Sequence, residues 1–295
     1  MTPSFLYITL MSAISLLAFA GNSILCRLAL GDGIIDASSF TAIRLLSGIV
    51  MLFALLAFKK GTIKTDNAVK IETKGSWLSA AFLFIYAVTF SFAYISLDTG
   101  TGALILFGTV QLTMILTSVF YKNKLYYWEW LGVLIAFSGL VYLVKPSLTT
   151  PSLMGFILMI ISGMAWAGYT LKGRASINPI NDTRYNFLRT FPFIIILILF
   201  SYQYAVLSSW GVVLAILSGA LTSAIGYAIW YIVLPRLSVI QASVIQLFVP
   251  TIAAFGGTIF MNELISIRLI LSSLMVLGGI SLVILGRHYY LPKEK

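Results

Sequence analysis

Polar residues inside long apolar stretches are the residues of this chain best placed to do chemistry. Asn22, Gln111 and Gln246 each stand within a run of mostly apolar residues. A polar group in hydrocarbon is costly, so such residues usually pair with one another or face a cavity. An amide both donates and accepts hydrogen bonds, which suits a zwitterionic or polyhydroxylated solute. The alternative role is a hydrogen bond between two helices.

Charged residues near the ends of the apolar stretches allow two interpretations each. Arg44 and Arg189 could hold the carboxylate of a substrate, or they could extend to the membrane interface or join helix ends. Glu263 follows an apolar stretch. It could take part in coupling, or it could form a structural ion pair, for which Arg268 is the candidate partner.

Aromatic residues within the apolar stretches form a second group of candidates: Tyr94, Trp166, Tyr169, Tyr227 and Trp230. An aromatic-walled cavity binds apolar or cationic solutes by packing and by cation–π attraction. The alternative role is the aromatic belt at the membrane interface. We expect these five residues and the three amides to line a substrate cavity.

The composition shows which solvent must surround these residues. Apolar residues make up 60% of the 295, and Asp, Glu, Lys and Arg make up 9%, against about 25% in a typical soluble domain. The mean hydropathy is +1.00. These charged residues are too few to form the surface of a soluble protein of this length. The chain is therefore expected to be an integral membrane protein whose partner is the lipid bilayer.

The same counts exclude several kinds of chemistry. Cys26 is the one cysteine and His288 the one histidine. One chain therefore holds neither a disulfide framework nor a Cys/His metal cluster, and a membrane nucleophile–histidine pair is excluded as well. We expect no catalytic residue, no metal and no cofactor, and hence no enzyme.

The chain divides into apolar segments that are each about as long as a membrane-spanning helix, for which about 20 residues are needed. Gly, Pro, Asp and Lys punctuate the breaks between them. This pattern predicts an all-α protein with ten spans, at residues 4–27, 37–58, 76–97, 101–121, 127–145, 152–172, 183–201, 210–233, 240–261 and 267–287.

Basic residues indicate the orientation of these spans. Most Lys and Arg fall in the loops that lie on the same side as the N-terminus. Because basic loops stay in the cytoplasm, both termini are predicted to be cytoplasmic. The same rule accounts for most of the net charge of +10, so no nucleic-acid partner is expected.

The ten spans contain a five-span unit used twice. Ala18-Phe19-Ala20-Gly21-Asn22 in the first span matches Ala165-Trp166-Ala167-Gly168-Tyr169 in the sixth, and Arg44 corresponds to Arg189. The predicted units are residues 1–147 and 148–295. Because five is odd, the second unit enters the membrane from the opposite side. Inverted repeats of this kind build secondary transporters, with the substrate site near the midplane.

These motifs resemble the drug/metabolite transporter superfamily and, within it, the EamA-type family. The two small/aromatic motifs and the paired arginines match the first and second helices of the family's repeat. Phe260-Met261-Asn262-Glu263-Leu264 resembles its apolar-Gly-Glu-apolar corner, with Asn262 in place of Gly. The first unit departs from that corner, since Lys124 stands where Glu is common. The resemblance covers nearly the whole chain.

The resemblance implies a permease in the plasma membrane of a bacterium that works by alternating access. Export of amino acids or related metabolites is the expected activity, with a proton or a counter-substrate as candidate coupling partner. The chain is expected to be a monomer or a homodimer. A facilitative channel or uniporter remains the first alternative, and a polytopic membrane enzyme the second. The substrate and the coupling ion are not determined by the sequence.

Overall fold

The computed structural model describes residues 5–60, 74–120, 126–144, 151–237, 242 and 245–290, and within these ranges it contains helices and no strand. The helices of the first half are α1 (Phe5–Leu30), α2 (Ala37–Lys60), α3 (Trp77–Tyr94), α4 (Thr99–Phe120) and α5 (Tyr127–Val144). Those of the second half are α6 (Leu153–Gly173), α7 (Pro179–Leu188), α8 (Phe191–Ser201), α9 (Ser209–Leu217), α10 (Gly226–Val233), α12 (Phe248–Met261) and α13 (Ile267–Tyr290). Short helical segments η1 (Tyr202–Tyr204), η2 (Ser218–Ile225) and η3 (Leu234–Arg236) complete the described chain.

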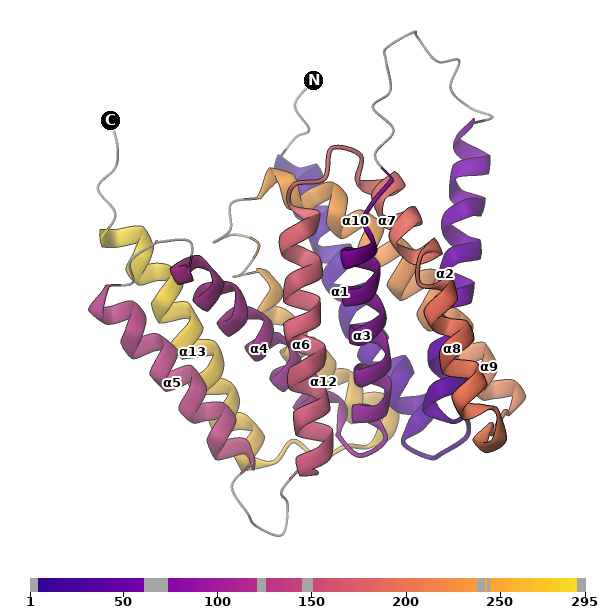
Figure 1. The fold of residues 1–295 in the computed structure, drawn as a ribbon. Coiled ribbons are helices and arrows are strands. Elements are labelled where there is room, and N and C mark those ends of the chain that lie inside the picture. The colour runs from indigo at the N-terminus through magenta and orange to yellow at the C-terminus, as the bar shows by residue number, and fades with distance from the viewer. Residues whose placement is uncertain are drawn as a thin grey trace, which may run out of the picture.

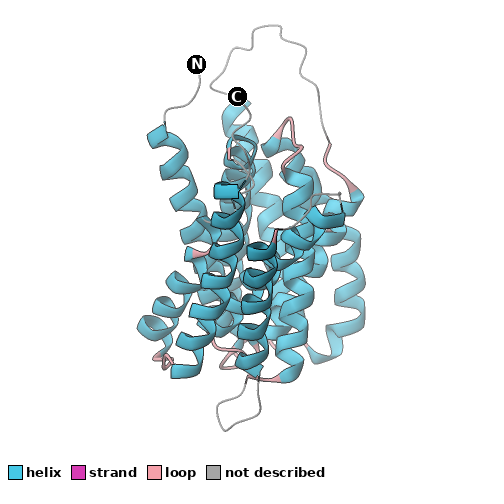
Figure 2. Cartoon of the chain, turned by 90° about the vertical axis from the view of Figure 1, so that its left-hand side faces the viewer, coloured by secondary structure: helices cyan, strands magenta, loops and turns pink. Residues whose placement is uncertain are grey.

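Eight stretches of the described residues are long and apolar enough to cross a membrane, and two shorter apolar helices, Phe248–Met261 and 267–283, accompany them. This is consistent with the ten predicted spans. The helices run side by side, with their connections gathered at the two ends of the bundle (Figures 1 and 2). We call the end where α1 begins and α13 ends the terminal side, and the end where α1 stops at Leu30 the far side.

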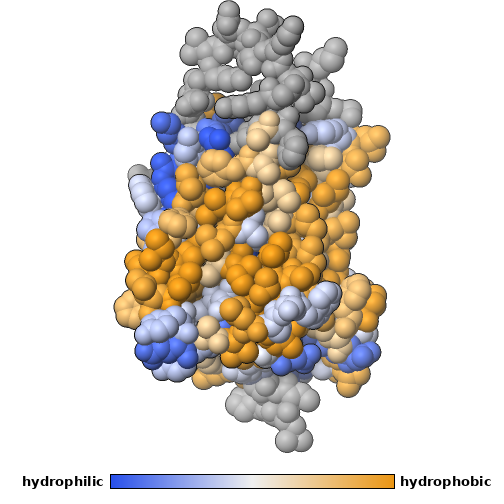
Figure 3. All heavy atoms as spheres, turned by 90° about the vertical axis from the view of Figure 1, so that its right-hand side faces the viewer, coloured by the Kyte–Doolittle hydropathy of each residue, from blue (hydrophilic) through white to orange (hydrophobic). Residues whose placement is uncertain are grey.

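The outer surface carries the apolar band expected of a membrane protein. Large apolar side chains of α8 are exposed, with Leu199 at 64% and Phe200 at 84% of their surface. Figure 3 shows an apolar band between two more hydrophilic ends. The chain is thus a multi-pass membrane protein, because only a hydrocarbon solvent would accept such a band.

One predicted span is interrupted. Residues 183–201 were expected as a single helix, but α7 stops at Leu188 and α8 starts at Phe191. Pro192 has no N–H to donate to the carbonyl of Leu188, so the helical ladder breaks there. The hydroxyl of Thr190 instead donates to the carbonyl of Phe187 at 2.7 Å.

The two halves interlock. α1 packs against α9, η2, α10 and α12 of the second half, whereas α6 of the second half packs against α3 and α4. The last helices of the halves, α5 and α13, pack on each other, as do α4 and α12. The first helix of each half thus lies among the third and fourth helices of the other.

Glycines allow these contacts to be close. The position of a Cβ at Gly219 in η2 is already taken by the carbonyl of Arg44 on α2, and Gly132 of α5 faces the backbone of Gly279 on α13. Small residues at helix contacts are the usual way for membrane helices to pack tightly. α2 and η2 are therefore held backbone against backbone at the level of Arg44.

Candidate substrate site

A fully buried arginine lies where the two halves meet. Arg44 of α2 has 1% of its surface exposed. Its Nε donates to the hydroxyl of Ser223 in η2 at 3.0 Å, and its Nη2 donates to the hydroxyls of Tyr227 at 2.8 Å and Tyr86 at 3.3 Å. Its guanidinium also lies 5.3 Å from the ring centre of Tyr86 and 5.1 Å from that of Phe90. Hydroxyl groups and aromatic rings, all of them neutral, therefore surround the charge.

No carboxylate balances this charge within the described residues. The ion pairs found there join Arg27 to Asp98 and to Glu263. A buried ion normally has a counter-ion, because desolvation costs several kcal/mol. Arg44 thus places a positive charge without an acidic partner at the centre of the bundle.

Asn22 of α1 extends the polar network. Its Nδ2 donates to the hydroxyl of Tyr86 at 3.1 Å, and its Oδ1 accepts from Ser218 at 2.7 Å and Thr222 at 3.3 Å. The hydroxyls of Tyr86 and Tyr227 are 2.9 Å apart. The Asn22–Arg44 network therefore joins α1, α2 and α3 of the first half to η2 and α10 of the second.

The backbone of η2 presents the hydroxyls of this network. Residues Ser218–Ile225 form a π-helical segment within the span that α9 begins and α10 ends. Such segments are rare and are frequently found at functional sites. Here Ser218 and Ser223 of η2, and Tyr227 in the first turn of α10, direct their hydroxyls to the network.

Aromatic rings fill the space beside the network. The ring of Phe19 lies 5.5 Å from Trp166, 5.8 Å from Tyr227 and 5.6 Å from Trp230, measured between ring centres. It also stacks at 6.3 Å on Phe107 of α4. These rings come from α1, α4, α6 and α10, and they close the centre of the bundle in this conformation.

Three buried hydrogen-bond donors at this centre have no partner among the described residues. Arg44 Nη1, Trp166 Nε1 and Trp230 Nε1 are buried and have no hydrogen-bond partner among the described residues. A buried donor without a partner costs about 1–3 kcal/mol. All three can donate and none can accept, so an acceptor from outside the chain would complete them.

The structure thus brings together five of the predicted cavity residues or anchors: Asn22, Arg44, Trp166, Tyr227 and Trp230. Tyr169 joins their edge, since its ring lies 5.5 Å from Trp166 and 4.9 Å from Tyr231.

Other predicted residues make different contacts. The hydroxyl of Tyr94 donates to the carbonyl of Thr99 at the far side. Gln111 of α4 and Gln246 before α12 are fully buried, and Gln246 Nε2 donates to the carbonyl of Ala242 at 3.0 Å.

Arg189 lies at the break between α7 and α8. Its Nη1 donates to the carbonyl of Lys74, just before α3, and its guanidinium lies 5.7 Å from the ring of Trp77. These contacts match the helix-anchoring role rather than contact with the Arg44 network.

Sequence reasoning missed Tyr86, Phe19, Ser218 and Ser223 as site residues. The signal for Tyr86 was its place in the middle of an apolar span, where a hydroxyl needs a partner. The serines of a mixed apolar span carry no comparable signal, because only the fold turns them toward Asn22 and Arg44.

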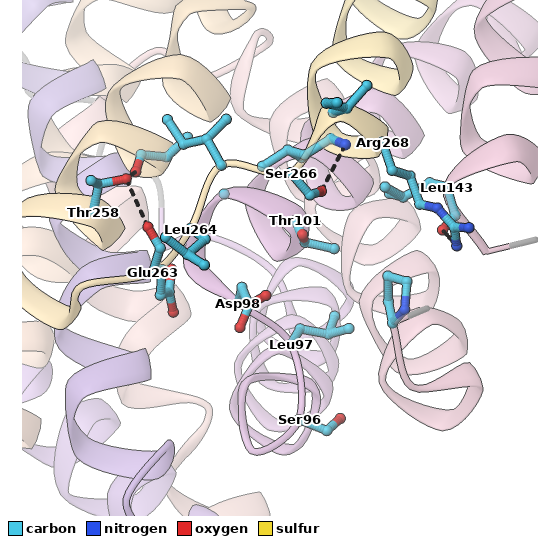
Figure 4. A pocket seen from close by; sticks show the side chains of 16 residues that line it. Ser96, Leu97, Asp98, Thr101, Leu143, Thr258, Glu263, Leu264, Ser266 and Arg268 are labelled. Carbon is cyan, nitrogen blue, oxygen red and sulfur yellow. Dashed lines mark hydrogen bonds between the residues drawn. The ribbon is translucent and has the colours of Figure 1, made fainter. Parts of the chain in front are cut away.

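A pocket of about 760 Å³ opens at the far side, and Asp98, Glu263 and Arg268 line it. Figure 4 places Asp98 and Glu263 on one side of it and Arg268 with Leu143 on the other. The expected pairing of Glu263 with Arg268 is wrong. Arg268 donates to the carbonyl of Leu143 at 3.5 Å, whereas Glu263 pairs with Arg27.

The Glu263 carboxylate closes a corner between four helices. Arg27 Nε at the end of α1 donates to Oε1 at 3.2 Å, and the backbone N–H of Thr99 in α4 donates to Oε2 at 2.8 Å. Arg27 also donates to the carbonyl of Tyr94 at 3.1 Å. The left-handed Asn262, with φ of 55°, turns the chain after α12 so that Glu263 points back into the bundle.

A second clamp lies at the terminal side. The backbone N–H of Gly75 donates to Asp182 Oδ1 at 2.9 Å, and that of Ser76 donates to Asn186 Oδ1 at 2.9 Å. α7 therefore holds the start of α3. At the far side Asp36, at the start of α2, likewise accepts from the N–H of Val206 before α9 at 2.9 Å.

Within the described residues no group of three or more His, Cys, Asp or Glu could hold a metal ion. Lys124 and the residues after 290 lie outside the described residues, and the side chain of His288 is not described either.

Known proteins support this architecture as that of a membrane transporter. The model of the EamA-like transporter family matches residues 153–285. A crystal structure with a TM-score of 0.64 covers 98% of this chain and 100% of its own at 15% identity, which shows the shared fold.

Three relatives extend the match over the first half. An uncharacterized protein of Pseudomonas aeruginosa is 44% identical over 278 residues, 94% of each chain. An uncharacterized transporter of Archaeoglobus fulgidus is 25% identical over 95% of this chain and 98% of its own. An uncharacterized transporter of Bacillus subtilis is 20% identical over 82% of this chain and 85% of its own. The chain belongs to the EamA-like transporter family, which confirms the resemblance, and is a membrane transporter of small solutes.

Proposed function

We propose that the chain is a secondary-active transporter that moves a small organic metabolite across the plasma membrane by alternating access. The observation that carries this proposal is the Asn22–Arg44 network, which is buried and is built from both halves of the chain. A central site shared by two halves is the arrangement that lets one site open to either face in turn.

The proposed units are two inverted repeats, residues 1–147 and 148–295. The reciprocal packing supports them, because α1 lies against α9, η2 and α10 just as α6 lies against α3. The two aspartates also support them: Asp36 holds the segment before α9, and Asp182 holds the segment before α3.

Amino acids or related metabolites are the proposed substrates, with export as the favoured direction. Arg44 would bind the carboxylate that these compounds share, since a guanidinium matches a carboxylate by two parallel hydrogen bonds. The aromatic rings around Phe19 would pack on the rest of the solute. Glu263 is assigned to closure of the far side through Arg27.

A flux measurement tests this proposal. The purified chain in proteoliposomes is loaded with one unlabelled acid, and uptake of the labelled acid is followed for a panel of amino acids and their deaminated relatives. We expect at least one solute to accumulate transiently against protein-free liposomes, and Arg44→Gln to abolish that uptake. Uptake that grows linearly without saturation would instead favour a channel, and uptake that Arg44→Gln leaves intact would move the site elsewhere.

A further inference from the structure

The positive charge of Arg44 at the centre of the bundle limits which net charge a bound substrate can carry. Arg44 is fully buried, yet its Nε and Nη2 donate only to hydroxyls of Ser223, Tyr86 and Tyr227. The described part of the chain provides no acid for it, since the ion pairs found there belong to Arg27. The site itself thus has a net charge of one positive unit.

We propose that the substrate is an organic anion with one carboxylate and no ammonium group, held by Arg44 against the aromatic rings. This inference rests on the proposed transport function and narrows its substrates from amino acids and related metabolites to the carboxylates without an ammonium group. A monoanion makes the occupied site neutral. A zwitterion leaves the site positive, and a cation doubles its buried charge, which is strongly unfavourable in hydrocarbon.

The unpartnered donors point the same way. Arg44 Nη1, Trp166 Nε1 and Trp230 Nε1 have no hydrogen-bond partner among the described residues, and each can donate a hydrogen bond but not accept one. A carboxylate has lone pairs for several donors. The amide oxygen within the network, Asn22 Oδ1, already accepts hydrogen bonds from Ser218 and Thr222, so an ammonium group would compete with these hydroxyls for it.

The aromatic rings set the shape of the rest of the solute. Phe19 touches Phe107, Trp166, Tyr227 and Trp230. A solute must take the place of some of these contacts, and an aromatic or branched apolar body regains the buried area that they lose. Aryl- and branched-chain carboxylates are therefore the favoured members of the class.

Probes with one body and different charges test the inference. 3-Phenylpropanoate, 3-phenylpropanamide and phenylalanine share a phenyl ring on a three-carbon chain, and phenethylamine is phenylalanine without its carboxylate. 4-Methylpentanoate and leucine provide the same comparison with a branched body. Binding to the full chain in detergent is measured by calorimetry, and flux of each probe is measured in proteoliposomes.

We expect the two acids to bind at least about tenfold more tightly than the matched amide and amino acids, a difference of about 1.4 kcal/mol. Arg44→Gln should remove the advantage of the acid over the amide, and Arg44→Lys should keep part of it. The control is Arg184→Gln, because Arg184 of α7 lies over the rings of Phe53 and Tyr185, outside the network. This variant should keep the full preference.

Each other result has a defined meaning. Phenylalanine or phenethylamine binding as well as the acid would overturn the inference, and their flux would leave the proposed transport function standing. Acid preference that survives in Arg44→Gln would overturn the assignment to Arg44. No binding and no flux of any probe would contradict both the inference and the proposed function.

Discussion

At the scale of single residues, the site depends on hydroxyl groups, because these and not carboxylates accept the hydrogen bonds of Arg44. Tyr86 is the clearest case, because its one oxygen meets Asn22, Arg44 and Tyr227. Deleting it leaves the Asn22 amide and part of the guanidinium without acceptors in the interior. The cost of such a loss exceeds that of the missing contact itself.

Tyr86→Phe is therefore expected to destabilise the folded chain by about 1–3 kcal/mol and to weaken substrate binding. Thermal unfolding in detergent gives the stability, and calorimetry with the acid probes gives the binding. Tyr204→Phe is the matched control, since Tyr204 is 76% exposed, and it should change the stability by less than about 0.5 kcal/mol. Equal stability of the two variants would contradict the role given to the Tyr86 hydroxyl.

At the scale of helices, the contact between α2 and η2 holds Arg44 in place. The Cβ of an alanine at position 219 would meet the carbonyl of Arg44 and the hydroxyl of Ser47. Because the carbonyl of Arg44 belongs to the backbone of α2, it cannot move away from this Cβ unless the whole helix shifts. The exposed Gly278 of α13 has nothing within 4 Å of an added Cβ.

Gly219→Ala should therefore cost about 1–3 kcal/mol of stability through overpacking, and Gly278→Ala should cost nothing or gain up to about 1 kcal/mol from helix propensity. Unfolding temperatures of the two variants, measured side by side, check this prediction. A Gly219→Ala variant as stable as Gly278→Ala would mean that α2 and η2 are not in close contact.

The Arg27–Glu263 pair makes a second prediction at this scale. It joins α1, α3, α4 and the corner after α12, so it should hold the far side closed. Cys26, the one cysteine of the sequence, is fully buried and directly precedes Arg27 in α1, so its labelling should report opening. Glu263→Gln removes an ion pair whose side chains are 13% and 19% exposed, which should raise thiol labelling by roughly tenfold.

Labelling by a membrane-impermeant thiol reagent, followed by mass spectrometry, measures this opening. Arg268→Gln changes a charge in the same pocket without removing the Arg27–Glu263 pair, so its labelling rate should match that of the natural chain. An unchanged rate in Glu263→Gln would show that this pair does not control access.

The sequence predicts much at the scale of helices and less at the scale of the site. The length of the apolar segments predicts most spans. The segment 127–145, for example, is observed as the helix Tyr127–Val144. Apolar length alone does not predict the break after Leu188, because it takes no account of the missing N–H of Pro192. The predicted partner of Glu263 is wrong because Arg268 is near Glu263 in sequence, whereas Arg27 is near it only in the folded bundle.

At the scale of the whole molecule, α1 begins and α13 ends at the same side (Figure 1), and the excess of Lys and Arg in the loops of that side predicts that it faces the cytoplasm. Fluorescent protein fused to either end of the chain should therefore fold and fluoresce in bacterial cells, and alkaline phosphatase fused there should stay inactive. Active phosphatase at either end would contradict the proposed orientation.

The account rests on a solute bound at Arg44 between the two halves. A structure of the full chain with 3-phenylpropanoate bound tests this directly. We predict the carboxylate within hydrogen-bond distance of the Arg44 guanidinium and the ring among Phe19, Trp166 and Trp230. The same probe bound in the far-side pocket beside Arg268, with the centre still closed, would contradict the account.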